Sequence, residues 1–116
     1  MLNLPPVVVE YLNAERAKDA ARLSLCFAED GVVHDEGRDR RGREGIRQWK
    51  EEVDAKYRYV SELLAASTQD NTVTLRMRLT GDFPGSPIEV NQIFRLERGQ
   101  IAIARDSVMS SPVPPG

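Results

Sequence analysis

Residues 31–36, with the sequence GVVHDE, place an imidazole and two carboxyl groups in consecutive positions. The two valines and the glycine that follows at Gly37 are typical of a short β-strand and its end. Successive strand residues point to opposite faces, so His34, Asp35 and Glu36 cannot converge on one ion. The chain contains a single histidine. We therefore expect no metal site here and place His34 at an exposed rim position.

Asp35 is the strongest candidate for a catalytic residue in this group. It shares its strand face with Val33, the apolar side, whereas His34 points the other way. A carboxylate on an inward face is costly unless it is paired or functional. Two alternatives follow: a general base in a pocket, or a structural ion pair with Arg38 or Arg40. Burial raises the pKa of a carboxyl group and an arginine lowers it, so the sign of the shift distinguishes them.

A second candidate acid, Asp106, lies in the late segment IAIARDSV. In an extended chain it shares a face with Ala102 and Ala104, whose small side chains would leave room for a ligand. The alternative is a structural role, in which Asp106 pairs with neighbours of Arg105 at the edge of a sheet.

Helical patterns occupy three parts of the chain. Pro5 and Pro6 suit the first turn of a helix, and Asp19 is a good N-cap for a second. Gly42 precedes the longest pattern, in which apolar side chains recur at spacings of three and four. Its apolar face comprises Ile46, Trp49, Val53 and Tyr57. The intervening charged residues, Lys50 among them, are expected on a solvated outer face.

Alternating patterns dominate the second half. The segments TVTLRMRLTG, IEVNQIFRLE and IAIARDSV predict antiparallel strands, joined by the turns DFPGSP and RGQ. The segment YVSELLAAST is compatible with either helix or strand, and SSPVPPG is too rich in proline for a sheet interior. Helices followed by a run of strands indicate an α+β fold, with helices against one face of a curved sheet.

Composition limits the function classes. A chain of 116 residues with a formal net charge of -2 is expected to form one domain, residues 1–116, without a basic field for nucleic acid. Acidic residues interrupt RDRRGR and no aromatic platform accompanies it. No apolar run reaches the ~20 residues of a membrane span. MLNLPPVVVEYLN does not predict a signal peptide, and the lone Cys26 fits a reducing compartment. We expect a cytoplasmic protein without nucleic-acid or membrane partners.

Three stretches carry a family resemblance: EYLNAERAKDAARLSLCFAEDGVVHDEG, RGREGIRQWKEEV and NQIFRLERGQI. Through them almost the whole chain resembles the nuclear-transport-factor-2-like superfamily, in particular its SnoaL-like and ketosteroid-isomerase-like proteins. The resemblance implies a cone, in which three helices close a strongly bent antiparallel sheet around an apolar pocket. The superfamily includes isomerases, cyclases, dehydratases, epoxide hydrolases and non-catalytic members, so the fold does not specify the activity.

The resemblance also implies roles for single residues. Asp35 matches the position of the catalytic base of ketosteroid-isomerase-like members, and Tyr11 that of the tyrosine that binds the oxyanion. The third element, a protonated aspartate, falls at Gln92, which departs from the pattern and argues against steroid isomerisation. SnoaL-like cyclases and epoxide hydrolases carry a working carboxylate on a late strand, as Asp106 would. The alternatives are a core tyrosine at Tyr11 and a pocket-lining amide without chemistry at Gln92.

These residues predict a pocket for a small apolar, oxygen-bearing molecule. If the protein is an enzyme, we expect proton transfer without metal or organic cofactor, with Asp35 as base and Asp106 as an alternative acid or base. The competing possibilities are a non-catalytic ligand-binding module and a dimerising interaction module. A cavity between Asp35 and Tyr11 favours an enzyme or binder, and a cone plugged by Trp49 and Phe94 favours interaction. The residues expected to line the pocket or to pack the core are Gln92, Trp49, Phe27, Met77, Phe83 and Phe94.

The outer sheet face is expected to mediate a homodimer. Long arginine side chains and Ile93 alternate with the inward residues and could bury their stems against a second copy. This face comprises Thr74, Arg76, Arg78, Asn91, Ile93 and Arg95.

Overall fold

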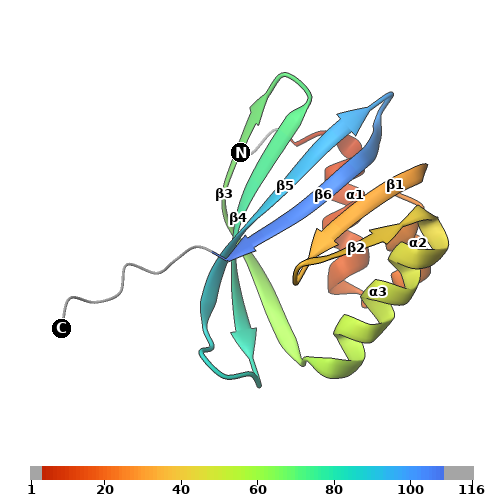
Figure 1. The fold of residues 1–116 in the computed structure, drawn as a ribbon. Helices are drawn as coiled ribbons and strands as arrows, with labels where there is room; N and C mark the ends of the chain where they lie inside the picture. Colours follow the sequence, from red (N-terminus) through yellow and green to blue (C-terminus); the bar gives the residue numbers. More distant parts are fainter. Residues whose placement is uncertain (1–3, 109–116) are drawn as a thin grey trace.

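The computed structural model describes residues 4–108, which form three helices and one six-stranded sheet. The predicted loose tail SSPVPPG lies outside the described residues. The strands are β1 (Phe27–Asp35), β2 (Arg38–Arg41), β3 (Tyr59–Gln69), β4 (Thr72–Gly81), β5 (Ile88–Glu97) and β6 (Gln100–Val108). Their order in the sheet is β2-β1-β6-β5-β4-β3. The sheet is strongly curved and open, and the helices lie on its concave side (Figure 1). The predicted α+β cone is confirmed.

The helices begin where the sequence indicates. Helix α1 (Pro6–Arg16) starts with Pro6 in its first turn, where a missing N–H costs nothing. Asp19 caps α2 (Ala20–Ser24) by accepting a hydrogen bond from the backbone N–H of Arg22 at 3.0 Å. Gly42, the first residue of α3 (Gly42–Lys56), has a φ of 76°, which a side chain would make strained. Short-range chemistry therefore determines all three helix starts.

The ambiguous segment is strand β3. It pairs with β4 in antiparallel register from Tyr59↔Gly81 to Gln69↔Thr72, with one irregularity between Leu63 and Ala65. Its leucine and alanine residues favour a helix, but a ladder of backbone hydrogen bonds to a neighbouring strand overrides that preference.

One pairing departs from the antiparallel pattern. Strand β1 runs parallel to β6, with Val33 opposite Ala104 and His34 opposite Arg105. The other four strand pairs are antiparallel. This parallel pairing joins an early strand to the last one, and it places Asp35 directly beside the part of β6 that carries Asp106.

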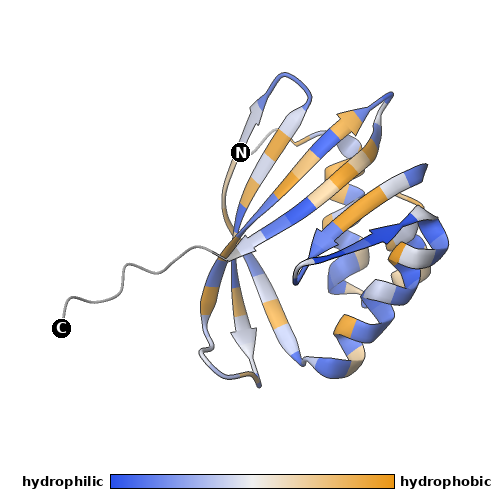
Figure 2. Cartoon of the chain, in the orientation of Figure 1, coloured by the Kyte–Doolittle hydropathy of each residue, from blue (hydrophilic) through white to orange (hydrophobic). Residues whose placement is uncertain are grey.

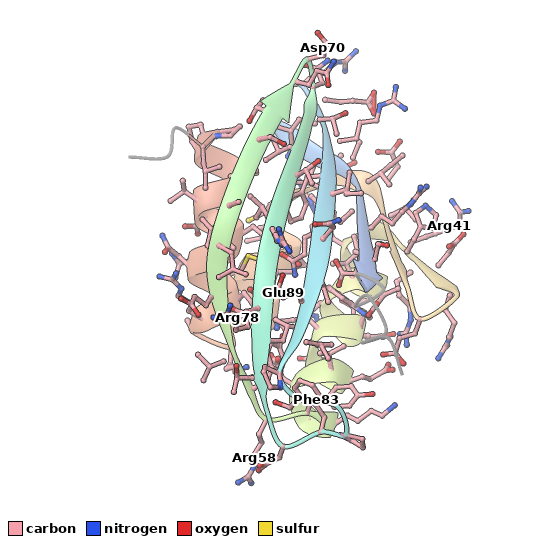
Figure 3. All side chains as sticks on the ribbon, turned by 90° about the vertical axis from the view of Figure 1, so that its left-hand side faces the viewer. Arg41, Arg58, Asp70, Arg78, Phe83 and Glu89 are labelled. Atoms are coloured by element: carbon pink, nitrogen blue, oxygen red, sulfur yellow. The ribbon has the colours of Figure 1, made fainter. Side chains whose placement is uncertain are left out.

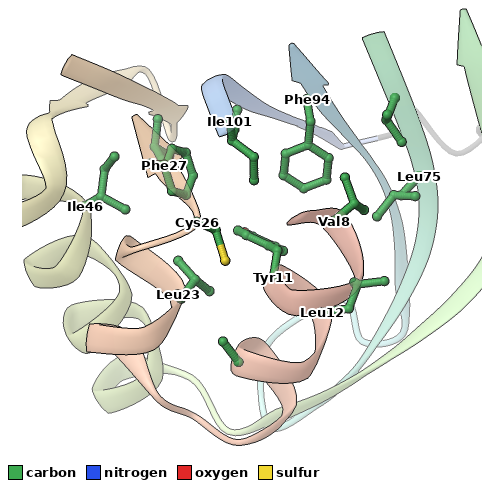
Figure 4. Packing of buried hydrophobic residues seen from close by; sticks show 14 of the residues in the cluster. Val8, Tyr11, Leu12, Leu23, Cys26, Phe27, Ile46, Leu75, Phe94 and Ile101 are labelled. Carbon is green, nitrogen blue, oxygen red and sulfur yellow. The ribbon is translucent and has the colours of Figure 1, made fainter. Parts of the chain in front are cut away.

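The core fills the interior between the helices and the sheet (Figure 4). Tyr11 projects from α1 between two rings, with centroid distances of 6.2 Å to Phe27 and 4.8 Å to Phe94 in edge-on geometry. Met77 and Leu75 of β4 extend the same cluster. Apolar and polar residues alternate along these strands, whereas β2 is polar throughout (Figure 2). No helix within residues 4–108 is long and apolar enough to cross a membrane.

Candidate functional site

Asp35 ends strand β1 with its carboxyl group turned towards helix α3. The indole Nε1–H of Trp49 donates a hydrogen bond to its Oδ2 at 2.9 Å. Within residues 4–108, Asp35 forms no ion pair, because Arg40 instead pairs with Glu52 at 2.7 Å. Burial raises the pKa of Asp35, and the Trp49 hydrogen bond opposes that rise without cancelling it. The pKa of Asp35 is thus shifted upwards, which is the direction predicted for a pocket carboxylate and not for a structural ion pair.

A cavity of about 100 Å³ opens beside this carboxyl group. Asp35, Trp49 and Tyr57 are among the residues that line it. Phe83 reaches this region from the β4–β5 turn, where its ring packs edge-on against Tyr57 at 6.3 Å. The other lining residues are Val53 and the charged Glu36, Arg38, Arg40, Glu52 and Lys56. The cavity thus lies between the β1–β2 hairpin and helix α3, and we refer to this region as the mouth of the cone.

Asp106 lies deeper, on the inner face of β6. It is directly opposite the buried Gln92 of β5, and its neighbour on the same face, Ala104, is buried. Within residues 4–108 its side chain forms neither a salt bridge nor a hydrogen bond, so the expected alternative, an ion pair at the sheet edge, is not found there. Burial, reinforced by the charges of Asp35 and Glu15, raises the pKa of Asp106 to about 8.

Asp35 and Asp106 follow the last paired residues of two neighbouring parallel strands, His34 and Arg105. Such strands lie about 4.8 Å apart. Repulsion by the charge of Asp35 contributes to the raised pKa of Asp106. The two neighbouring carboxyl groups therefore disfavour being ionised together.

Tyr11 and Gln92 lie behind these acids. Tyr11 is buried in the aromatic core, and burial together with the charges of Glu15 and Asp106 raises its pKa well above the ordinary value. Tyr11 thus occupies a core position, and within the described part of the chain its hydroxyl forms no hydrogen bond. Gln92 is also buried, and its Oε1 has no partner among residues 4–108.

The remaining expected pocket residues separate into two groups. Trp49 and Phe83 lie at or next to the mouth, whereas Phe27, Met77 and Phe94 are buried in the core cluster. His34 lies on the other side of β1, partly accessible, and forms an ion pair with Asp39 of β2. Its position agrees with the rim position expected from strand alternation.

Comparison with known proteins identifies the family. Residues 8–104 match the model of the SnoaL-like domain. The chain belongs to the SnoaL-like family. A putative polyketide cyclase from Sinorhizobium meliloti is 33% identical, with a TM-score of 0.86 over 90% of this chain and 95% of that one. No curated protein matches.

More distant structures share the fold of this SnoaL-like domain. A hypothetical protein with a ketosteroid isomerase-like fold from Catenulispora acidiphila, in complex with trimethylamine, is 24% identical; its TM-score is 0.79 over 90% of this chain and 85% of that one. An epoxide hydrolase of the LEH-like type from M. tuberculosis is 16% identical, with a TM-score of 0.72 over 90% and 80% of the two chains.

The SnoaL-like domain also contains a buried polar cluster that the sequence did not predict. Lys50 is 1% exposed, and its Nζ donates to Asp54 at 2.8 Å and to the hydroxyl of Tyr59 at 3.0 Å. Glu15 is buried beside it and accepts a hydrogen bond from Ser61 at 3.1 Å. The cluster joins α1, α3 and β3 next to the acids of the site.

The placement of Lys50 on a solvated outer face was therefore wrong. Burial lowers the pKa of Lys50, but Tyr59, Asp54 and Glu15 more than offset that effect and raise it. A signal was present in the sequence: Lys50 stands four residues after Ile46, on the border of the apolar face. Glu15 likewise shares the face of Tyr11. Neither spacing shows that the two charges meet.

Proposed function

We propose that this SnoaL-like domain binds a small apolar, oxygen-bearing molecule and catalyses a proton transfer of the isomerase or cyclase type without a cofactor. One observation carries the proposal. Asp35 and Asp106 lie on adjacent strands, and their environments separate their pKa values, so that one is a base when the other is an acid. Such pairs of titratable groups are typical of acid–base sites.

The proposed step moves two protons. Asp35, ionised, removes a proton from a carbon next to a carbonyl group, and the electron pair of the broken C–H bond forms the enolate. Asp106, neutral, donates its proton to the carbonyl oxygen, where negative charge develops. The hydroxyl of Tyr11 can donate a further hydrogen bond to that oxygen. In isomerisation, Asp35 returns its proton to carbon while Asp106 takes back the proton of the enol oxygen. In ring closure, the enol carbon attacks a second carbonyl carbon, the oxygen of that carbonyl takes the proton held by Asp35, and Asp106 takes back the proton of the enol oxygen.

The relatives support this class of reaction. The 33%-identical structure is described as a putative polyketide cyclase, and cyclisation of that kind requires an enolate. The ketosteroid isomerase-like relative holds trimethylamine, a small organic molecule. These proteins share the fold, so the support concerns the type of chemistry and leaves the substrate open.

The test is exchange of α-hydrogens for deuterium in a panel of small ketones and β-dicarbonyl compounds, selected after native mass spectrometry of co-purified ligands. We expect Asp35→Asn to slow exchange by roughly 10²–10⁴-fold, the usual contribution of a general base. Asp30→Asn is the matched control, because Asp30 is an exposed acid on the same strand. Equal exchange rates in Asp35→Asn and the native protein would refute the role of Asp35, and binding without exchange would indicate a binding module.

A second candidate function rests on the size of the cavity. Its volume of about 100 Å³ is smaller than the roughly 300–1,000 Å³ of ordinary ligand pockets, and aromatic side chains fill the interior behind it. A cone filled in this way favours a protein-interaction role. Absence of any bound small molecule in native mass spectrometry and of exchange with every ketone would support this candidate.

We also propose that the domain forms a homodimer through the outer face of β4 and β5. Arg76 and Arg78 lie there with Glu89, paired at 2.8 and 3.7 Å (Figure 3). On the same face Ile93, opposite Thr74, is partly buried and could be covered by a second copy, with the aliphatic stems of the arginines adding apolar surface. Light scattering at micromolar concentration should give about twice 13.0 kDa. The mass of a single chain at every concentration would refute the dimer.

A further inference from the structure

Gln92 is the residue whose role is least explained by packing. It is 3% exposed, and within residues 4–108 its Oε1 is fully removed from solvent and has no hydrogen-bond partner. An orphaned buried acceptor costs about 1–3 kcal/mol. Folded proteins rarely leave such a group without a donor, so a donor is expected close to Oε1 of Gln92.

The neighbour across the strand pair supplies that donor. Gln92 is directly opposite Asp106 in the antiparallel β5–β6 ladder. Side chains at such positions start from Cβ atoms about 4.5–5.5 Å apart and contact each other. An ionised aspartate can only accept hydrogen bonds, but a protonated one has an O–H to donate. The side-chain amide of Gln92 makes no hydrogen bond to Asp106 through its nitrogen within the described residues.

We propose that Gln92 is a positioning residue that holds the proton of Asp106, with the carboxyl O–H of Asp106 donating to Oε1 of Gln92 across the β5–β6 pair. This one hydrogen bond gives Oε1 of Gln92 a donor and fixes the position of the carboxyl proton of Asp106. The arrangement belongs to the free protein and holds whether or not a reaction is catalysed.

The charges around Asp106 favour the neutral form from several elements. Asp35 of β1 and Glu15 of α1 repel a negative charge there, and only Lys50 of α3 attracts one. The field of Asp106 also reaches the hydroxyl of Tyr11 on α1. An acceptor oxygen at Gln92 adds to the same preference, because it binds the protonated form and repels the ionised one.

The deciding experiment is the titration of Asp106, followed by carbon NMR of its carboxyl group, in the native protein and in Gln92→Met. Methionine matches the length and volume of glutamine but lacks the oxygen. We expect the pKa of Asp106 to fall in the variant. A rise would mean that the amide nitrogen faces Asp106, and no change would mean no contact; either result would overturn the proposal. Asn91→Met is the control, because Asn91 lies on the opposite face of the same strand.

A second measurement needs no change at Gln92. The carbonyl carbon resonance of the Gln92 side chain should shift as Asp106 loses its proton near pH 8, since its hydrogen bond is then lost. In Asp106→Asn, whose amide donates at every pH, that shift should vanish. A Gln92 resonance that ignores the ionisation of Asp106 in the native protein would refute the hydrogen bond, even if Gln92→Met failed to fold.

Discussion

The mouth of the cone and its inner wall carry similar charged side chains in different surroundings. At the mouth, Arg40 pairs with Glu52, and the carboxylate side chain of Glu52 is exposed to solvent. On the inner wall, Lys50 is enclosed by Asp54 and Tyr59, and the side chain of Asp106 forms no salt bridge within residues 4–108. Water screens the first group and cannot reach the second freely. A charge at the mouth therefore has little effect on stability, whereas one on the inner wall affects both stability and protonation.

Asp35 stands at the boundary between these regions. Its carboxyl group contacts the cavity at the mouth and accepts the hydrogen bond of Trp49 from the interior. Two aspartates on neighbouring strands thus have different surroundings, because Asp35 lines the cavity and accepts a hydrogen bond, whereas Asp106 lies opposite the buried Gln92. The contrast can be tested by changing one side chain at a time in each region.

The largest effect is expected for Lys50→Met. Removing this cation leaves the buried Glu15 without its positive neighbour and leaves Asp54 with only the more distant Lys18, at 3.8 Å, which should lower the free energy of unfolding by about 3–5 kcal/mol. Urea denaturation at pH 7 measures the loss. Lys56→Met, on the exposed end of the same helix, should cause no measurable change. Equal stabilities of the two variants would remove the distinction between inner wall and mouth.

The second largest effect on stability is expected for Asp106→Asn. The folded protein holds this carboxyl group at a pKa of about 8, above its value in the unfolded chain, so its contribution to stability is lost as pH rises from about 4 to 8. Asparagine does not titrate. The variant should therefore gain stability relative to the native protein as pH rises, on the order of a few kcal/mol at pH 9. Thermal melting from pH 5 to 9 measures this gain, and a constant difference would contradict it.

A smaller change of the same sign is expected for Asp35→Asn. Its pKa is also raised, so the ionised form costs stability above the pKa of the unfolded chain. Asparagine keeps an oxygen that can accept the hydrogen bond of Trp49, and the fold should persist with slightly higher stability at pH 7. Titration by carboxyl NMR checks the cause. A pKa below about 3.9, together with a destabilised variant, would show that Asp35 is a structural ion-pair partner.

The smallest effect is expected for Glu52→Gln, which breaks the ion pair with Arg40 at the mouth. Exposed pairs of this kind contribute little because water screens them. Its melting temperature should match that of the native protein. A distinct loss of stability would show that the mouth is less hydrated than the comparison assumes.

The sequence by itself determined the helix starts, the strand faces and the family. Asp19 and Gly42 act through their own backbone neighbours, and the alternation at Val33–Asp35 needs only an extended chain, so residue type and spacing predict them. These local rules were also sufficient to direct Asp35 inwards.

Only the tertiary structure decided which of these residues meet. The pairing of β1 with β6 brings Asp35 beside Asp106 from the other end of the chain, and the packing of α1, α3 and β3 encloses Lys50 with Glu15. The strand state of β3 likewise follows from its ladder with β4. The physical reason is the same in each case: hydrogen bonds and electrostatic interactions between segments distant in sequence depend on their positions in space, which residue spacing does not contain.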